Sequence, residues 1–112
     1  MIKTDLHEDG ILILTLTENR LDAANTPQFR ELVIEQLKNG LSRIVLNMHT
    51  VQFVDSSGLG GLVSILKRIG PMGDLVLVGL APNVLKTFTL TRMDRVFSIA
   101  PDVDAALKQL QD

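Results

Sequence analysis

The stretch that decides the fold is "FVDSSGLGGLV", residues Phe53 to Val63. It passes from apolar residues through Asp55, Ser56 and Ser57 into three glycines, and each glycine costs a helix interior about 1 kcal/mol relative to alanine. Beyond this corner, apolar residues recur at spacings of three and four, which predicts a helix that begins near Ser57 and stops at Gly70-Pro71. The recurring residues are Leu59, Leu62, Val63, Leu66 and Ile69. The corner therefore joins a strand to a helix.

The residues before the corner predict two strands, a helix and a third strand. Residues 1–17 form a hairpin because Asp9-Gly10 readily supplies the positive φ angles of a tight turn. In its second strand, leucines 12, 14 and 16 share one face, and the alternate isoleucines share the other. Residues 18–25 follow as a loop. Thr26 then offers an N-cap and Pro27 suits the first position of a helix that ends at Asn39-Gly40, before a strand over 42–48.

Strands and helices continue to alternate after the corner. The sequence predicts a strand over 74–80, a helix over 82–93, a brief strand over 95–99 and a last helix capped by Asp102. This alternation predicts an α/β fold, with a mixed sheet of four to five strands, a parallel core and about four covering helices. The initial hairpin is what makes the sheet mixed.

Composition limits the size and the partners of the protein. With 112 residues, of which 46% are hydrophobic, the chain suits one domain over residues 1–112. The net charge is −2, and the longest run of basic residues is Lys67-Arg68. Four phenylalanines are the only aromatic residues, so there is little surface on which bases could stack. We therefore expect no nucleic-acid partner.

The absence of cysteine excludes disulfides, cysteine-based zinc sites and thiol catalysis. The first ten residues contain acidic side chains where a signal peptide would need an apolar core, and no apolar run approaches about 18 residues. These features predict a cytoplasmic protein that is not attached to a membrane.

The polar residues and the glycines of the corner need separate explanations. An Asp or Ser that caps the helix contributes about 1 kcal/mol, and capping accounts for one or two of the residues 55–57. Gly58, Gly60 and Gly61 leave the backbone open to close approach by a neighbouring helix, a ligand or another protein. Packing of small residues inside the domain is the alternative that needs no function.

Three chemical interpretations of the corner compete. A nucleophilic serine would need a base, but His7 and His49 have no recognisable triad context and the G-x-S-x-G motif is absent. A nucleotide phosphate could lie on Gly58-x-Gly60, but the spacings of the known phosphate-binding loops are not matched. Phosphorylation of a serine would add about −1.5 to −2 charges to an uncharged helix start, enough to create or abolish an interface. The helix dipole would tolerate this charge, so the fold should survive it.

The motifs "VDSSGLG" and "RLDAANTPQFR", with the predicted order of strands and helices, closely resemble the STAS family, the domain of sulfate transporters and anti-sigma factor antagonists. The resemblance covers nearly the whole chain and implies a bacterial anti-sigma factor antagonist, which is not an enzyme and needs no cofactor or metal. It implies that the unmodified form binds an anti-sigma factor and thereby releases a sigma factor. That partner is a serine kinase of the histidine-kinase-like ATPase fold. Phosphorylation by the kinase ends the binding, and a PP2C-type phosphatase restores it.

Within the corner, the resemblance implies that Ser57 is the phosphoacceptor. Asp55 and Ser56 would shape and cap the same turn, while Gly58, Leu59 and Gly60 would form the surface that the kinase approaches.

Upstream, Asp22 matches the family aspartate that lies beside the phosphoacceptor and contributes to partner binding. Its alternative role is that of a turn or capping aspartate ahead of the helix. Where many members have a glycine before the Leu-Asp pair, this chain has Asn19-Arg20. Asparagine tolerates positive φ nearly as well as glycine, so we expect the turn to persist and Arg20 to affect the choice of partner.

A second class of function stays open. The chain could be a STAS subunit that is not phosphorylated and serves as a structural or ligand-sensing component of a transporter or signalling complex, because a fold does not fix a function. A catalytic role ranks third, since no acid–base pair or metal cluster stands out.

Overall fold

The fold is built on a five-stranded mixed sheet in the order β1-β2-β4-β6-β7. We describe it from a computed structural model, which describes residues 1–111. Strand β1 runs antiparallel to β2, and the remaining neighbours are parallel. The strands are β1 (Ile2–Leu6), β2 (Leu12–Leu16), β4 (Arg43–Asn47), β6 (Asp74–Val78) and β7 (Ser98–Ala100). The predicted mixed α/β sheet is confirmed, including the hairpin turn, where Gly10 has a φ of 87°.

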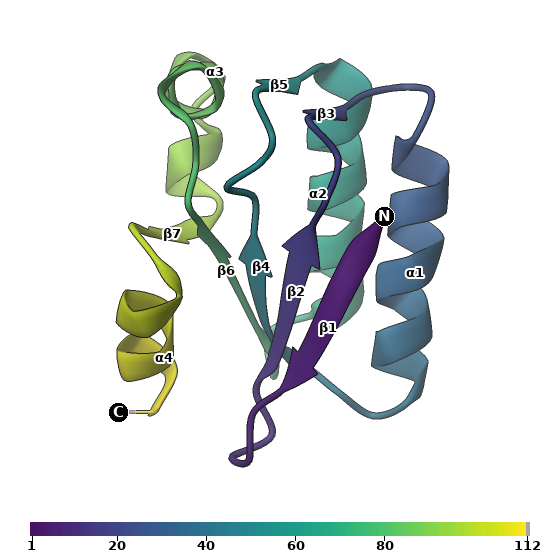
Figure 1. Cartoon of the computed structure of the whole chain (residues 1–112), viewed down its shortest axis with the longest axis vertical. Coiled ribbons are helices and arrows are strands. Elements are labelled where there is room, and N and C mark those ends of the chain that lie inside the picture. Colours follow the sequence, from purple (N-terminus) through teal and green to yellow (C-terminus); the bar gives the residue numbers. More distant parts are fainter. Residues whose placement is uncertain (112) are drawn as a thin grey trace.

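Four α-helices accompany the sheet within residues 1–111. They are α1 (Thr26–Lys38), α2 (Ser56–Ile69), α3 (Pro82–Leu90) and α4 (Val103–Gln111). Helices α1 and α2 pack side by side on one face of the sheet, and α4 packs on the other against β4, β6 and β7 (Figure 1). No helix in this part of the chain is both long enough and apolar enough to cross a membrane.

The alternation of side chains along β2 separates two cores. Leu12, Leu14 and Leu16 belong to the larger core, which also contains buried residues of α1, α2 and α3. Ile11 and Ile13 belong to a smaller core on the opposite face, closed by α4 through Ala106. The predicted division of the leucines and isoleucines between the two faces of this strand is therefore confirmed.

The start of α1 differs from the prediction. Asn25, not Thr26, occupies the N-cap position, and Thr26 is the first residue of the helix and is buried. The Asn25 side chain makes no capping hydrogen bond. It instead bonds to the backbone of Arg20 and Asp22 in the preceding turn, and this local turn ends one residue before the helix begins.

Residues 18–25 are not wholly a loop, as the sequence predicted. Strand β3 (Arg20–Leu21) pairs in parallel with β5 (Phe53–Val54), and Arg20 lies opposite Phe53. This two-residue pairing is too short to leave a periodic signal in the sequence. It places the loop before α1 directly beside the corner before α2, at the top of the view in Figure 1.

The predicted helix over 82–93 and strand over 95–99 are also shifted. Helix α3 ends at Leu90, a short 3₁₀ helix follows over Met93–Arg95, and β7 begins only at Ser98. Phe97 precedes the strand because its N–H donates to the Met93 carbonyl at 2.9 Å and so belongs to the turn. Its ring packs edge-on against Phe88, with 5.7 Å between ring centroids, and anchors this turn in the core.

Candidate functional site

The candidate site lies where α1 and α2 both begin. Helix α2 starts at Ser56, and Asp55 is its N-cap with an extended backbone. Its Oδ1 atom accepts a hydrogen bond from the backbone N–H of Gly58 at 2.8 Å. The predicted capping role of Asp55 is thus present, and it satisfies one of the otherwise unpaired N–H groups of the first turn.

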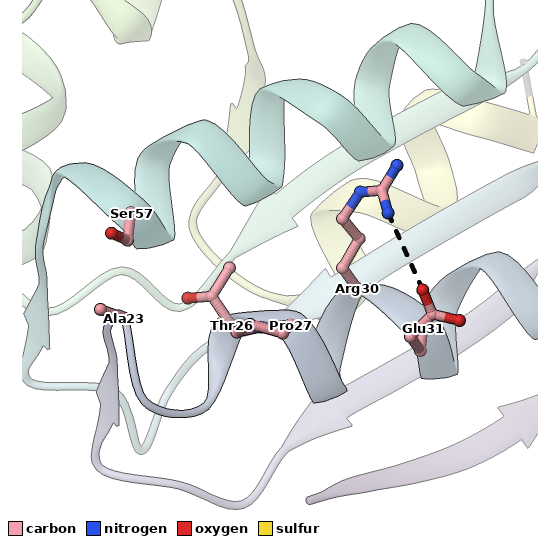
Figure 2. Close-up of a pocket in the computed structure, with 6 residues that line it drawn as sticks. All are labelled: Ala23, Thr26, Pro27, Arg30, Glu31 and Ser57. Carbon is pink, nitrogen blue, oxygen red and sulfur yellow. Dashed lines mark ion pairs between the residues drawn. The ribbon is translucent and has the colours of Figure 1, made fainter.

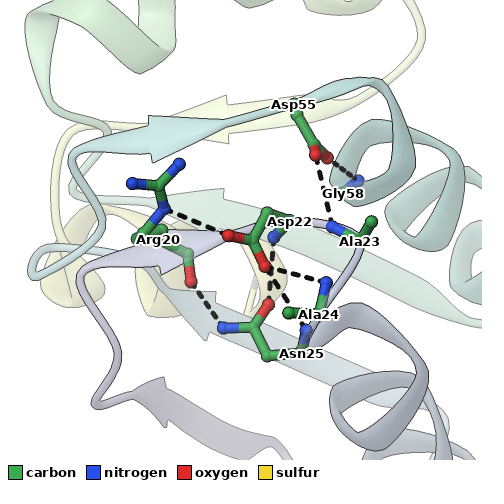
Figure 3. Close-up of polar contacts among 7 residues, drawn as sticks. All are labelled: Arg20, Asp22, Ala23, Ala24, Asn25, Asp55 and Gly58. Atoms are coloured by element: carbon green, nitrogen blue, oxygen red, sulfur yellow. Dashed lines mark hydrogen bonds and ion pairs between the residues drawn. The ribbon is translucent and has the colours of Figure 1, made fainter.

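Asp55 also ties the two loops of the site together (Figure 3). Its Oδ2 atom accepts a hydrogen bond from the N–H of Ala23 at 3.2 Å, while its own N–H donates to the carbonyl of Leu21 at 3.2 Å. One carboxylate therefore fixes the start of α2 and the turn that precedes α1.

Asp22 is held inside that turn. Its Oδ1 atom accepts hydrogen bonds from the N–H groups of Ala24 at 3.0 Å and Asn25 at 3.4 Å, and its Oδ2 atom accepts from Arg20 Nε at 3.0 Å. Asn25 closes the turn, because it accepts from the N–H of Asp22 at 2.9 Å and donates to the carbonyl of Arg20 at 2.7 Å. Asp22 therefore forms the turn ahead of α1, which is the second of the two roles that the sequence suggested for it. It lies next to Asp55.

Ser56 and Ser57 are exposed in the first turn of α2, which contains no acidic residue. Ser57 lines an open hollow of about 430 Å³ between the starts of α1 and α2 (Figure 2). The other lining residues are Ala23, Thr26, Pro27, Arg30 and Glu31. The side chain of Ser57 is accessible, and it makes no hydrogen bond within residues 1–111.

Arg30 gives this hollow its only positive charge among the lining residues, and the sequence did not single it out. Its Nε atom donates to Ser64 Oγ at 2.7 Å, and its Nη1 atom lies 3.9 Å from Glu31 Oε1. Arg30 thus links α1 to α2 two turns beyond Ser57.

The three glycines of the corner have different surroundings. A Cβ atom at Gly58 would lie 2.5 Å from the Leu21 carbonyl oxygen, and one at Gly61 would overlap the Thr26 methyl group. At Gly60 a Cβ atom would meet nothing within 4 Å. Packing inside the domain therefore explains Gly58 and Gly61, but it does not explain Gly60.

This arrangement corrects part of the predicted surface. Gly58 is buried and cannot face an approaching protein, because β3 and β5 cover it. Leu59 is partly buried against the larger core, whereas Gly60 is exposed. Of the predicted partner-binding residues in α2, only Ser56, Ser57 and Gly60 are fully open to the outside.

Phe53 is a further surface residue that the sequence analysis did not select. Its side chain is 47% exposed, and the guanidinium carbon of Arg20 lies 4.9 Å from the centre of its ring. The chain bends at Asn19, where the turn was expected, but without a positive φ, since Arg92 is the one non-glycine residue with positive φ in residues 1–111. The chain enters strand β3 there instead of making a glycine-type turn.

The histidines lie in other loops. His7 Nδ1 is 2.8 Å from Asp9 Oδ1, and His49 Nδ1 is 3.2 Å from Asn47 Oδ1. Neither ring has a hydrogen bond to Ser57 within the described residues. Neither histidine is therefore placed as a base for Ser57.

Comparison with known proteins places this chain in a family. The model of the STAS domain matches residues 4–106. A candidate anti-sigma factor antagonist of Thermotoga maritima is 30% identical over 105 residues, which cover 92% of each chain. The crystal structure of a candidate antagonist from that organism matches 99% of this chain and 95% of its own, with a TM-score of 0.88 and 27% identity.

More distant structures share the fold alone. The phosphorylated form of the Bacillus cell fate determinant SpoIIAA has a TM-score of 0.72 at 19% identity, over 98% of this chain and 99% of its own. The murine anion transporter Slc26a9 has a TM-score of 0.78 at 23% identity, but the match covers 91% of this chain and only 18% of the transporter.

Proposed function

Since the chain belongs to the STAS domain family, we propose that it is a cytoplasmic anti-sigma factor antagonist that phosphorylation of Ser57 switches off. The unmodified form binds an anti-sigma factor, a serine kinase of the histidine-kinase-like ATPase fold, and a sigma factor is released. Phosphorylation by this kinase ends the binding, and a PP2C-type phosphatase restores it. Residues 1–112 act as a single STAS domain that binds and is modified but catalyses nothing.

The observation that carries this proposal is the exposed Ser57 hydroxyl on an uncharged first helical turn. A phosphoryl group there would add about −1.5 to −2 charges where a partner approaches. The hollow beside Ser57 gives the added group room, so the domain itself need not rearrange. The N-terminal end of α2 favours an anion, which further supports a switch that acts on the interface and not on the fold.

The surroundings of Ser57 suit a binding surface of fixed shape. Asp22 and Asp55 hold the two loops rigidly through their hydrogen bonds. Gly58 lets α2 pack closely under those loops, and Gly60 keeps the outer side of the first turn bare. In this proposal the residues that contact the partner are Ser56, Ser57, Leu59 and Gly60. They are held in position by Asp22, Asp55 and Gly58.

Two measurements test the switch. The purified chain, incubated with its cognate kinase and ATP, should gain one phosphoryl group by mass spectrometry, and Ser57→Ala should gain none. Ser56→Ala is the matched control, because it removes the neighbouring exposed hydroxyl, and it should be modified normally. Full modification of Ser57→Ala would refute the site. Ser57→Asp should weaken the complex, and unchanged affinity would refute the electrostatic mechanism.

The second candidate is a subunit of a transporter or signalling complex without a phosphorylation cycle. The likeness to the domain within Slc26a9 supports it, although only at the level of the fold. Identification of the proteins that co-purify with the chain separates the two functions. An ATPase of the kinase fold would support the switch, whereas a membrane transporter would support this alternative.

A further inference from the structure

Arg20 and Phe53 form an exposed pair at the outer side of the β3–β5 ribbon. The two residues lie opposite each other in the ladder, and the guanidinium carbon of Arg20 is 4.9 Å from the ring centre of Phe53. The next residues along both strands, Leu21 and Val54, are buried. Arg20 and Phe53 therefore lie on the exposed side of the ribbon, and Arg20 lies beside Asp22, whose Oδ2 atom accepts from its Nε.

Several contacts hold Arg20 in place before any partner arrives. Asn25 binds its carbonyl oxygen at 2.7 Å, Asp22 Oδ2 accepts from its Nε at 3.0 Å, and the Phe53 ring supports its guanidinium plane. Binding of a partner would therefore cost little additional side-chain entropy. Within residues 1–111, Asp22 accepts a hydrogen bond only from Nε, and the two terminal nitrogens of Arg20 donate none.

The chemistry of the pair defines what it can bind. A guanidinium presents its N–H donors as a planar fork, which matches a carboxylate with two parallel hydrogen bonds. Arginine and aromatic side chains are also the residue types enriched at the energetic centres of protein interfaces. Phe53 adds an apolar surface, 47% exposed, beside the charged fork.

The pair is continuous with the proposed switch. Arg20 bonds to Asp22, and Asp55 accepts from the N–H of the next residue, Ala23, so the pair adjoins the turn that packs against the start of α2. Asp55 also caps the helix turn that carries Ser57. A protein seated on the first turn of α2 could therefore also contact the Arg20–Phe53 pair.

We infer that Arg20 and Phe53 form the second half of the partner-binding surface, where Arg20 binds an Asp or Glu side chain of the anti-sigma factor and Phe53 packs against an apolar side chain beside it. This inference rests on the proposed function. According to this inference, Arg20 favours partners that present a carboxylate at this point. A neutral or basic side chain there would leave the guanidinium of Arg20 unpaired.

The test compares Arg20→Gln with Arg68→Gln in binding to the co-purified anti-sigma ATPase. Arg68 is an exposed arginine in the last turn of α2, so it controls for the loss of one positive charge. We expect Arg20→Gln to weaken binding at least about fivefold and Arg68→Gln to change it less than twofold. Arg20→Lys should recover only part of the loss because a lysine lacks the fork. Phe53→Ala should also weaken binding.

Salt dependence separates a direct contact from a local structural defect. Wild-type affinity should fall as NaCl is raised, and the dependence should be shallower for Arg20→Gln than for Arg68→Gln. Equal or tighter binding by Arg20→Gln, with binding still abolished by Ser57→Asp, would overturn this inference and leave the switch intact. If Ser57→Asp binds normally while Arg20→Gln does not, the switch fails but the Arg20 surface is supported.

Discussion

Gly58 lies against Leu21 so closely that a Cβ atom at residue 58 would stand 2.5 Å from the Leu21 carbonyl oxygen. That carbonyl already accepts the N–H of Asp55, which caps the helix containing Gly58. The Leu21 carbonyl thus contacts both Asp55 and Gly58, although Leu21 is far from them in the sequence. The corner is built around this contact, and several experiments follow from it.

Gly58→Ala should destabilise the protein strongly. The added methyl group would meet the backbone of β3 and the Val54 side chain, and a backbone carbonyl cannot rotate away as a flexible side chain can. Overpacking of this kind costs about 1–3 kcal/mol, which exceeds the gain of about 1 kcal/mol in helix propensity. Urea denaturation measures the change, and a variant as stable as the wild type would contradict the close packing.

Gly60→Ala is the matched control, with the opposite expected sign. Gly60 has a helical backbone and open space around it, so alanine should stabilise the protein by up to about 1 kcal/mol. If the partner packs closely against the backbone at Gly60, the same variant should bind the anti-sigma factor more weakly despite its higher stability. Stabilisation with unchanged affinity would show that the partner does not contact residue 60.

Two substitutions of Asp55 should distinguish the contributions of its two hydrogen bonds to stability. Asp55→Ala removes the acceptors for both Gly58 and Ala23, and loss of the cap alone costs about 1 kcal/mol. Asp55→Asn keeps one oxygen for Gly58 but has no second acceptor for Ala23, so its loss of stability should be smaller. Amide hydrogen exchange at Ala23 should rise in both variants. Unchanged protection of Ala23 would show that the bridge between the loops contributes little.

Ser57→Asp should leave the fold intact. Residues 56–59 of α2 contain no acidic side chain, and an anion there interacts favourably with the helix dipole by about 0.3–1 kcal/mol, a gain that repulsion from the capping Asp55 carboxylate partly offsets. We expect a melting temperature equal to or slightly above that of the wild type, with any gain reduced at high salt. A clear drop in melting temperature would mean that the charge acts by loosening the domain and not by blocking the partner.

The long elements of the fold could be predicted because each carries its own repeating signal. The apolar spacing of α2 and the alternation in β2 each extend over several residues, and both helix and strand were found where predicted. The β3–β5 pairing could not be predicted, because two residues in each strand give no period and the partners are far apart in sequence. The start of α1 moved because Asn25 belongs to the turn around Asp22, and the start of β7 moved because a 3₁₀ turn extends to Phe97.

The sequence predicted which residues form the candidate site, but not how they are arranged. The order Asp-Ser-Ser-Gly identified the residues of the corner and the cap at Asp55. It did not distinguish the buried Gly58 from the exposed Gly60, since this depends on what packs against each side of the helix. Nor did it connect Arg20 with Phe53, which meet only across a parallel ladder.

The sequence by itself determined the alternation of strands and helices and a capped helix start within residues 55–57. These follow from local backbone preferences and from the periodicity of burial, which short segments carry within themselves. Only the tertiary structure decided which glycine packs inside and which stays bare, and which side chains surround Ser57. Those outcomes depend on the pairing of β3 with β5. These two segments are far apart in the sequence, and only the folded core brings them together.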